Sequence, residues 1–205
     1  MIKLIIFDFS GVCYSEEEKP YLHIFADKHK LKFEEVEPFF DELIVKSERD
    51  EISGKEVWDK VIKKFTIKKF KIKEKYSAEN IIKEMISLKK ENTEMLELAK
   101  KLGEKYKTAF FTNYNRDFWQ EVEKIFNPAH YFNFGIVSYQ INSRKPEPKG
   151  FLGILEHFKV KPEEAIFTDD SLKNVLKAKE LGINAIHFKN IEQFKEELNK
   201  LGVVV

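Results

Sequence analysis

The sequence predicts an α/β fold, a doubly wound parallel sheet with an inserted helical cap. Short apolar runs alternate with amphipathic stretches from about residue 93 onward, which is typical of parallel strands joined by helices. An earlier apolar run at 2–7 is separated from the next, at 106–111, by a long region of helical pattern. This region is far longer than the dozen or so residues that one crossover needs, so it indicates an insertion.

Composition limits the classes of function. The chain has 205 residues, 42% of them hydrophobic, enough for one large domain or a core with an inserted domain. The net charge of +1 gives no strong field that would favour nucleic acid or a membrane surface. Cys13 is the single cysteine, which excludes an intrachain disulfide and favours a reducing compartment. We expect a cytoplasmic protein with no nucleic-acid or membrane partner, whose oligomeric state the sequence leaves open.

The inserted segment is expected at 15–90, and the core at 1–14 and 91–205. Apolar residues recur at i, i+3 and i+4 through the insertion. This spacing predicts helices at 23–30, 36–47, 55–65 and 78–90. A lysine-rich stretch at 67–75 is interpreted as a solvated surface, because a nucleic-acid patch would favour arginine and stacking aromatics.

The second half of the core is predicted element by element. We expect helices at 93–102, 115–126, 148–157, 171–181 and 191–201, and strands at 106–111, 134–139, 164–168 and 183–188. Gly103 and Gly182 follow two of the helices, as helix-ending glycines do. Pro128 follows a third, because the residue before a proline avoids helical geometry.

Polar motifs stand where three of the strands end. Asp8 follows the first strand, so its carboxylate is placed to attack phosphorus or to bind Mg²⁺. Gly11 allows the backbone to turn sharply beside a ligand. Thr112 and Asn113 end the second strand, where a hydroxyl, an amide and the start of a helix can bind a phosphoryl oxygen.

Two further motifs complete the set. Lys145 lies in the proline-stiffened sequence RKPEP, so its ammonium group is presented from a fixed loop and can offset charge on a phosphorylated intermediate. Asp169 and Asp170 follow the strand at 164–168 and together suit a divalent cation. Asn174 lies four residues after Asp170 and is expected to orient it.

Each motif alone has an ordinary explanation. Asp8 could end a turn, Thr112 and Asn113 could cap a helix, Lys145 could be a surface charge, and the aspartates could cap the helix that follows. Their occurrence in this order, at successive strand ends, favours a common site, because the carboxyl ends of parallel strands meet at one edge of a sheet.

With these motifs the core resembles the haloacid dehalogenase superfamily of phosphohydrolases. The similarity covers Asp8 in FDFSGV, the Thr112–Asn113 pair, Lys145 in RKPEP, and DDSLKNVLKAKELG at 169–182. It is greatest to the subgroup that contains the phosphatase domain of soluble epoxide hydrolases and bacterial sugar-1-phosphate phosphatases. The lid sequence DEISGKEVWDKV at 50–61 is also similar to the cap of that subgroup.

The resemblance implies a role for each matching residue. Asp8 would be the nucleophile that forms an aspartyl-phosphate. Mg²⁺ would be bound by Asp8, the backbone carbonyl of Ser10 and Asp170, with Asp169 close by. Thr112, Asn113 and Lys145 would bind and stabilise the phosphoryl group. The residues expected to contact the substrate are Gly11, Thr112, Asn113 and Arg116.

Ser10 departs from the family pattern. Phosphatases of this family usually carry an aspartate there, which protonates the leaving group and then activates water. The loss of such an acid–base group costs about 10²–10⁴-fold in rate. We therefore expect slow turnover, a good leaving group, or a replacement acid from the lid, for which His23, Glu51 and Arg116 are candidates.

The hypothesis with most support is a Mg²⁺-dependent phosphohydrolase acting on a small phosphorylated metabolite, such as a sugar phosphate. One alternative is a 2-haloacid dehalogenase, which also uses an aspartate nucleophile and lacks the second aspartate. The other is a non-catalytic phosphate-binding or metabolite-binding regulator. Phe39, Phe40 and Trp58 are candidates for lining the substrate pocket, although aromatic residues at helical spacing more often form a core.

Overall fold

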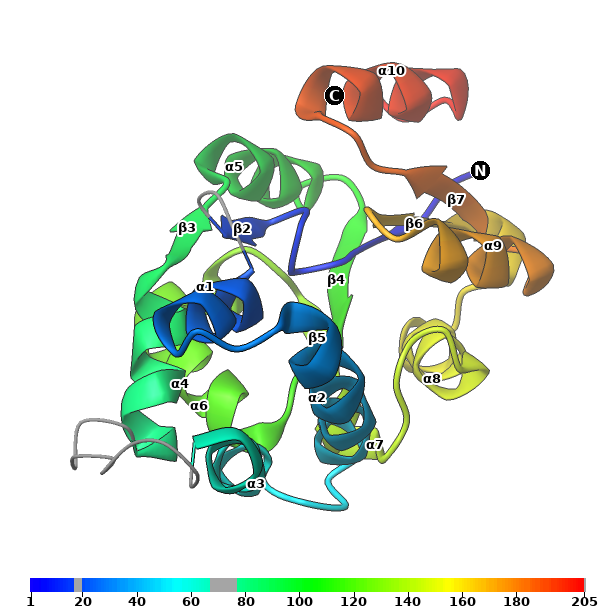
Figure 1. Ribbon diagram of the computed structural model, residues 1–205. Helices are drawn as coiled ribbons and strands as arrows, with labels where there is room; N and C mark the ends of the chain where they lie inside the picture. Colours follow the sequence, from blue (N-terminus) through cyan, green and yellow to red (C-terminus); the bar gives the residue numbers. More distant parts are fainter. Residues whose placement is uncertain (17–19, 67–76, 205) are drawn as a thin grey trace.

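The computed structural model describes residues 1–16, 20–66 and 77–204. A five-stranded parallel sheet has the order β5-β4-β1-β6-β7 (Figure 1). Its strands are β1 (Leu4–Phe7), β4 (Lys107–Thr112), β5 (Phe134–Val137), β6 (Ala165–Asp169) and β7 (Asn184–His187). The core helices are α5 (Thr93–Leu102), α6 (Arg116–Phe126), α7 (Ser138–Ile141), α8 (Pro148–Phe158), α9 (Leu172–Glu180) and α10 (Ile191–Lys200), with short 3₁₀ helices at Pro128–His130 and Pro162–Glu164. The predicted α/β class is confirmed.

The strand order reverses direction at β1. From β1 the chain proceeds outward through β4 to β5, and later through β6 to β7 on the other side. Phe7 of β1 lies opposite Phe110 of β4 and Thr168 of β6. In open α/β sheets ligands bind at such a switch point, beyond the carboxyl ends of the strands. The motifs that follow β1, β4 and β6 therefore meet at this position.

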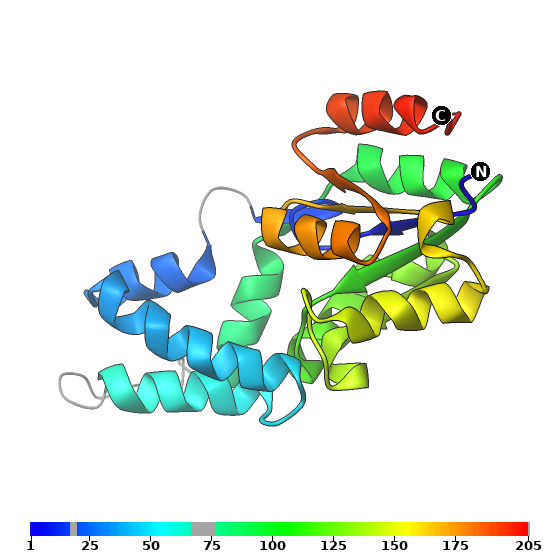
Figure 2. The ribbon, with the colours of Figure 1, turned by 90° about the vertical axis from the view of Figure 1, so that its right-hand side faces the viewer.

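Side-chain alternation along β1 divides the core into two layers. Ile5 and Phe7 belong to the cluster that includes α5 and α10, whereas Leu4 and Ile6 belong to the cluster that includes α8 and α9. Successive residues of a strand point to opposite faces, so this arrangement follows from the run of apolar residues itself. In Figure 2, α5 and α10 lie above the sheet and α8 lies below it.

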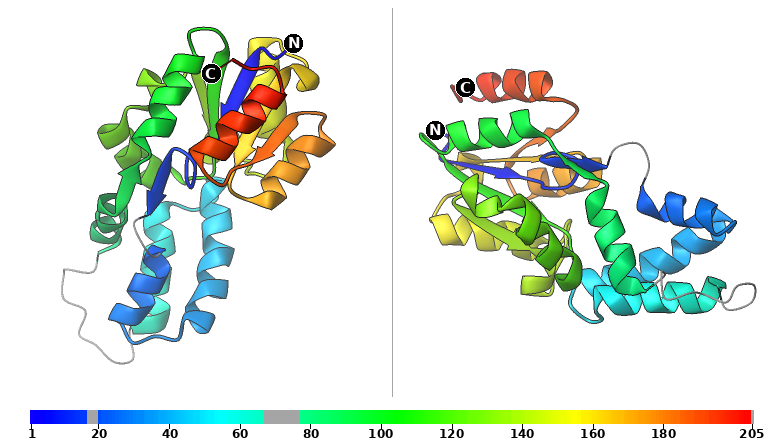
Figure 3. Two further views of the ribbon diagram at one scale, coloured as in Figure 1. Left: turned by 90° about the horizontal axis from the view of Figure 1, so that it is seen from above. Right: turned by 90° about the vertical axis from the view of Figure 1, so that its left-hand side faces the viewer.

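The described residues of the segment between β2 (Tyr14–Glu16) and β3 (Lys89–Glu91) are mostly helical, as their apolar spacing predicts. The helices are α1 (Tyr21–Lys28), α2 (Phe33–Glu48), α3 (Gly54–Thr66) and α4 (Ala78–Ser87). Figures 2 and 3 show α1, α2 and α3 projecting beyond one end of the sheet. The helix predicted at 78–90 ends earlier, because Lys89–Glu91 forms strand β3. The lysine-rich stretch 67–75 lies outside the described residues.

Strand β3 pairs antiparallel with β2 (Tyr14–Glu16), which the sequence analysis placed partly in the helical insertion. Each strand is only three residues long, so neither shows a period that can be told from a helix. This small sheet lies at both points where the chain passes between the core and the α1–α4 segment. It therefore fixes the end of β1 to the end of that segment.

The strand predicted at 134–139 was too long, because β5 ends at Val137 and Ser138 begins α7. The Ser138 hydroxyl accepts a hydrogen bond from the Tyr114 backbone N–H and donates one to the Tyr114 carbonyl, both at 3.1 Å. This local pairing competes with strand geometry.

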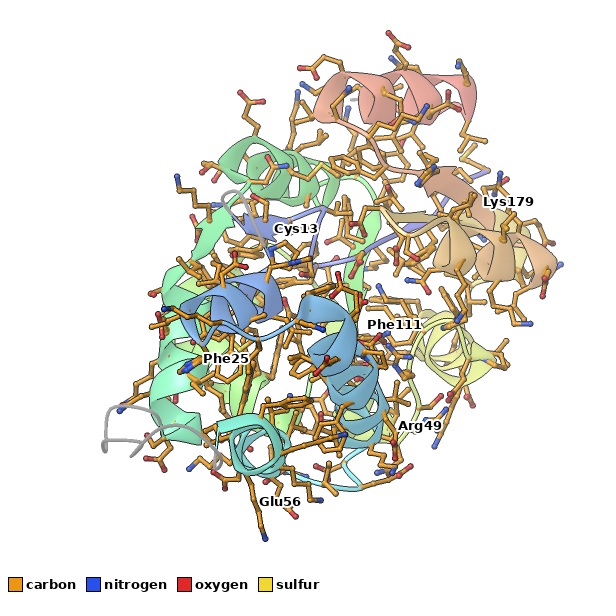
Figure 4. The ribbon with its side chains drawn as sticks, viewed as in Figure 1. Cys13, Phe25, Arg49, Glu56, Phe111 and Lys179 are labelled. Atoms are coloured by element: carbon orange, nitrogen blue, oxygen red, sulfur yellow. The ribbon has the colours of Figure 1, made fainter. Side chains whose placement is uncertain are left out.

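Arginine side chains join the α2–α3 turn to the core. Arg116 makes two contacts to Asp50, of 3.2 and 2.6 Å, and Nε of Arg144 lies 2.5 Å from Glu48. Arg49, labelled in Figure 4, pairs with Glu147 in the loop before α8. These are the three arginines of the sequence, against 33 lysines. A planar guanidinium can pair with both oxygens of a carboxylate, which suits it to a fixed junction.

Every described helix is too short or too polar to cross a membrane.

Candidate active site at the ends of β1, β4 and β6

Asp8 occupies the first position after β1 and is 94% buried, with 6% of its surface exposed. Its backbone N–H donates to the Thr168 carbonyl at 2.8 Å, which continues the pairing between β1 and β6. Oδ1 accepts a hydrogen bond of 2.6 Å from the N–H of Phe9. Burial raises the pKa of Asp8 from 3.8 to about 7, an effect that Lys145 opposes and Asp169 reinforces. The carboxylate is thus held rigidly in a site that favours added positive charge.

Lys145 supplies part of that positive charge. Its Nζ lies 2.7 Å from Oδ1 of Asp8 and 2.7 Å from Oδ2 of Asp169, and its exposed fraction is 2%. Burial lowers the pKa of Lys145, but the two carboxylates outweigh burial and hold the pKa above its ordinary value. The residue therefore stays an ammonium ion between the two carboxylates.

Asn113 holds the Lys145 loop in place. Its side-chain oxygen accepts from the Lys145 N–H at 2.8 Å, and its side-chain nitrogen donates to the Lys145 carbonyl at 3.1 Å. From the sequence we expect this amide to bind a phosphoryl oxygen. Here both of its polar atoms contact the backbone of Lys145, so Asn113 acts on the lysine through the loop.

The two aspartates after β6 have different surroundings. Asp169 is fully buried and accepts from Lys145, from the Ser171 N–H at 2.8 Å, and from Asn174 at 3.1 and 3.0 Å. The prediction that Asn174 orients Asp170 is wrong, because its amide reaches back over the first helical turn to Asp169. Asp170 is exposed at the surface, but its carboxyl group is partly desolvated, and this desolvation together with the charge of Asp169 raises its pKa.

Gly11 packs directly against Asp170. Its φ of +85° is a left-handed conformation that glycine adopts without strain. A Cβ atom added there would lie 2.2 Å from Oδ2 of Asp170. The sharp turn after Asp8 therefore favours glycine, because a side chain here would be strained and would displace the Asp170 carboxylate.

The carboxylates fit a divalent cation. One oxygen from each of Asp8, Asp169 and Asp170 lies within 4.8 Å of the others. Three carboxylates around a single ammonium leave an excess of negative charge, and Mg²⁺ prefers oxygen ligands of this kind. Since Asp169 already accepts four hydrogen bonds, Asp8 and Asp170 are the better placed pair for an ion.

Thr112, the last residue of β4, is 1% exposed. Its hydroxyl oxygen is buried and has no hydrogen-bond partner among the described residues. A buried polar atom in this state costs free energy unless a ligand or water satisfies it. The contact between Thr112 and an anion stays a prediction.

Cys13, labelled in Figure 4, donates a hydrogen bond of 3.3 Å from Sγ to the Asp8 carbonyl. Burial, reinforced by the charge of Asp8, raises the pKa of its thiol. A buried thiol that remains protonated is a structural group, so Cys13 supports the turn after β1.

The three predicted replacement acids lie away from Ser10. His23 stacks on Phe33, with ring centroids 3.5 Å apart. Arg116 is paired with Asp50, and Glu51 is exposed in the α2–α3 turn. Among the described residues, a charged group that does contact Ser10 is Lys89 of β3, whose Nζ lies 3.5 Å from the Ser10 hydroxyl. Nothing in the sequence distinguished this lysine from its many neighbours.

A cavity of about 170 Å³ opens beside Ser10 and Asn113, between the core and the α1–α4 segment. Its lining is mostly apolar and aromatic, with two charged residues, Glu48 and Lys89. Of the three aromatic residues predicted to line a pocket, Phe40 and Trp58 do so, whereas Phe39 packs on Phe65 with centroids 5.8 Å apart.

Comparison with known proteins agrees with this geometry. Residues 2–182 match the family model described as haloacid dehalogenase-like hydrolase. Flavin mononucleotide hydrolase 1 of Arabidopsis thaliana is 32% identical over 96 residues, 46% of this chain and 38% of the plant protein. Bifunctional epoxide hydrolase 2 of Rattus norvegicus is 28% identical over 135 residues, 62% of this chain and 24% of the rat protein. The chain thus spans well under half the length of these two relatives.

A solved structure is similar over nearly the whole chain. It is a HAD family enzyme of Bacteroides thetaiotaomicron in complex with magnesium and inorganic phosphate, 28% identical to this chain. The superposition covers 92% of this chain and 95% of the bacterial one, with a TM-score of 0.76.

Proposed function

Because the chain belongs to the haloacid dehalogenase-like hydrolases, we propose that it is a Mg²⁺-dependent phosphatase acting on a small phosphorylated metabolite. The observation that carries this proposal is the buried arrangement of Lys145 between Asp8 and Asp169, with Asp170 close by. The structural relative crystallised with magnesium and phosphate supports the same chemistry.

In this proposal Asp8 attacks phosphorus and takes the phosphoryl group as an aspartyl-phosphate, which water then hydrolyses. Oδ1 contacts Lys145 and Phe9, so Oδ2 is the oxygen placed to attack. Lys145 offsets the charge that develops on the phosphoryl oxygens. Asn113 positions Lys145, and the Thr112 hydroxyl donates to a phosphoryl oxygen.

Mg²⁺ would be held by Asp8, Asp170 and the backbone carbonyl of Ser10, with Asp169 close by. When bound, it would neutralise phosphoryl charge and draw the substrate to Asp8. Gly11 allows this turn to lie against Asp170 without a clash.

The helices between residues 15 and 90 act as a cap over this site in our proposal, with 1–14 and 91–205 as the catalytic core. The cavity beside Ser10 lies at their junction and would hold the leaving group. Its lining by Trp58, Tyr114 and Phe118 favours a leaving group with an apolar or planar face, which sugars and aromatic alcohols both offer. Arg116 pairs with Asp50, so we assign it to the junction between cap and core instead of to the substrate.

A dehalogenase is a weaker candidate, because halide displacement does not call for a cluster of three carboxylates. A purely regulatory role is also a weaker candidate. Asp8 and Lys145 form a buried ion pair, and such pairs with shifted pKa values are concentrated at catalytic sites.

The test is hydrolysis of p-nitrophenyl phosphate with Mg²⁺, with EDTA, and by the variant Asp8→Asn. Its good leaving group reduces the need for an acid at position 10. We expect activity that requires both the metal and Asp8, followed by selectivity within a panel of sugar phosphates, aryl phosphates and flavin mononucleotide. Activity that survives Asp8→Asn would contradict the proposal, as would equal turnover in EDTA.

A further inference from the structure

Among the described residues, Lys89 is a cationic residue in contact with Ser10, where the family's second aspartate is missing. Its Nζ lies 3.5 Å from the Ser10 hydroxyl, the outer limit of a hydrogen bond. Ser10 comes two residues after Asp8, on the turn that separates the carboxylates from the cavity. A leaving-group oxygen bound between phosphorus and the cavity would therefore lie within reach of both side chains.

The backbone around Lys89 is fixed to this turn. Strand β3 pairs with β2 in the register Tyr14 opposite Glu91. Asn92 then donates from its backbone N–H to the Cys13 carbonyl at 2.9 Å, and from its side chain to the Val12 carbonyl at 3.0 Å. Lys89 thus belongs to the same rigid unit as Ser10, although 79 positions separate them in sequence.

Two aromatic rings also lie near the ammonium group of Lys89. Nζ of Lys89 lies 5.7 Å from the ring centre of Tyr114 and 5.6 Å from that of Phe118. These two rings are stacked, with centroids 5.0 Å apart, and both line the cavity. A cation within about 6 Å of a ring face is attracted to it, so the ammonium is directed toward the boundary between Ser10 and the cavity.

We propose that Lys89, with the Ser10 hydroxyl, stabilises the leaving-group oxygen in place of the missing aspartate; this inference rests on the phosphatase function proposed above. As Asp8 bonds to phosphorus, the bond from phosphorus to the leaving oxygen breaks, and that oxygen keeps the electron pair. Lys89 donates a hydrogen bond to it and offsets its charge, remaining an ammonium ion throughout. The proton that completes the alcohol comes from water.

This substitution has a chemical consequence for the second half of the reaction. An aspartate can accept a proton from the attacking water, whereas an ammonium ion has no lone pair to do so. Lys89 therefore assists the departure of the leaving group but not the hydrolysis of the aspartyl-phosphate. We expect the phosphorylated enzyme to accumulate during turnover.

The test compares Lys89→Met with wild type on phosphate esters of increasingly basic alcohols, from p-nitrophenol to simple alkyl alcohols. Removing a donor aimed at developing charge costs roughly 10²–10³-fold in a buried site, and we expect about 10–100-fold here on alkyl esters because Lys89 is only partly buried. The loss on p-nitrophenyl phosphate should be several-fold smaller, since that leaving group needs little stabilisation.

Lys90→Met is the matched control, because the next residue on the same short strand points to the opposite face and is exposed. Lys89→Arg keeps the charge and the donors, so it should restore most of the loss even if Lys89→Met is poorly folded. An equal loss on every ester, or no loss, would overturn the role of Lys89 while leaving the phosphatase intact. A wild type inactive on all the esters would instead overturn the phosphatase proposal and this inference together.

Discussion

The ammonium group of Lys145 lies 2.7 Å from Oδ1 of Asp8, and both side chains are almost completely buried. The lysine comes from the loop before α8, whereas the aspartate ends β1, so the pair forms only when the sheet is assembled. It sets the charge of the site and joins two distant parts of the core.

Replacement of Lys145 by methionine should destabilise the fold and abolish hydrolysis. Asp8 and Asp169 would stay buried without their counter-charge, and breaking such a buried ion pair costs about 3–5 kcal/mol. Urea unfolding of the metal-free protein at neutral pH measures this loss. Lys3→Met is the control, because the 2.6 Å pair between Lys3 and Glu164 lies at the surface and should contribute far less to stability. Equal losses for the two variants would contradict the assigned role of Lys145.

Gly11→Ala should remove Mg²⁺ binding. The added methyl group would meet Asp170 at 2.2 Å, and the φ of +85° would add strain of about 1–2 kcal/mol. Calorimetric titration with Mg²⁺ measures the effect. Gly202→Ala separates backbone strain from the clash with a neighbouring side chain. Gly202 has a φ of +77°, but its added Cβ would contact nothing within 4 Å. We expect Gly202→Ala to lose some stability and to bind Mg²⁺ as the wild type does; unchanged affinity in Gly11→Ala would show that Asp170 is not a ligand.

Thr112→Val should weaken phosphate binding with little change in stability. Its hydroxyl has no hydrogen-bond partner among the described residues, so the folded protein loses no contact when the hydroxyl is removed. Inhibition of the enzyme by inorganic phosphate gives the affinity, and we expect it to fall about 10- to 150-fold, since one hydrogen bond to a charged group contributes about 1.5–3 kcal/mol.

Thr108→Val provides the comparison on the same strand. The Thr108 hydroxyl lies 3.4 Å from Oδ1 of Asn133, at the opposite end of β4. This variant should lose stability without a change in phosphate affinity. If Thr108→Val weakened phosphate binding and Thr112→Val instead lost stability, Thr112 would not belong to the anion site.

Two glutamates at the junction should respond to pH in opposite directions. Burial raises the pKa of Glu48 above 4.5 although Arg144 pairs with it. Burial also raises the pKa of Glu147, but hydrogen bonds from Arg49 and Ser143 outweigh it and hold the pKa below 4.5. The contribution of Glu48 to the free energy of unfolding is therefore fully present below about pH 4.5, and it is lost as the pH rises through the raised pKa of Glu48. Glu147 contributes stability above its ordinary pKa that is lost as pH falls.

Unfolding of Glu48→Gln and Glu147→Gln across about pH 2.5 to pH 8 tests these signs. Glu48→Gln should remove part of the decline toward high pH, and Glu147→Gln part of the decline toward low pH. Profiles that stay parallel to the wild type would show that neither side chain has a shifted pKa.

The sequence was sufficient to predict the sheet and most of its helices, because apolar periodicity and strand-ending polar residues are local signals. The predicted helix at 93–102 has the bounds of α5, since Asn92 caps its start with a 3.2 Å hydrogen bond to the Met95 N–H. The sheet β2–β3 was not predicted, because strands of three residues carry no period.

The sequence predicted only those site residues that belong to a recognisable motif. Asp8, Lys145 and Asp169 meet as expected, because they follow strands or a fixed loop at the switch point. Lys89 approaches Ser10 through the pairing of β2 with β3, a tertiary contact that no local pattern encodes. Arg116 was expected at the substrate, but its guanidinium pairs with both oxygens of Asp50, a partner that no local pattern identifies.

The most direct test of the account is to identify the phosphorylated residue during turnover. Wild type and Asp8→Asn are mixed with acetyl phosphate and Mg²⁺, quenched in acid, digested and analysed by mass spectrometry. The account predicts a phosphoryl group on Asp8 in the wild type, labile to hydroxylamine and absent from the variant. Steady turnover with the phosphoryl group on another residue, or with none on the enzyme, would contradict it.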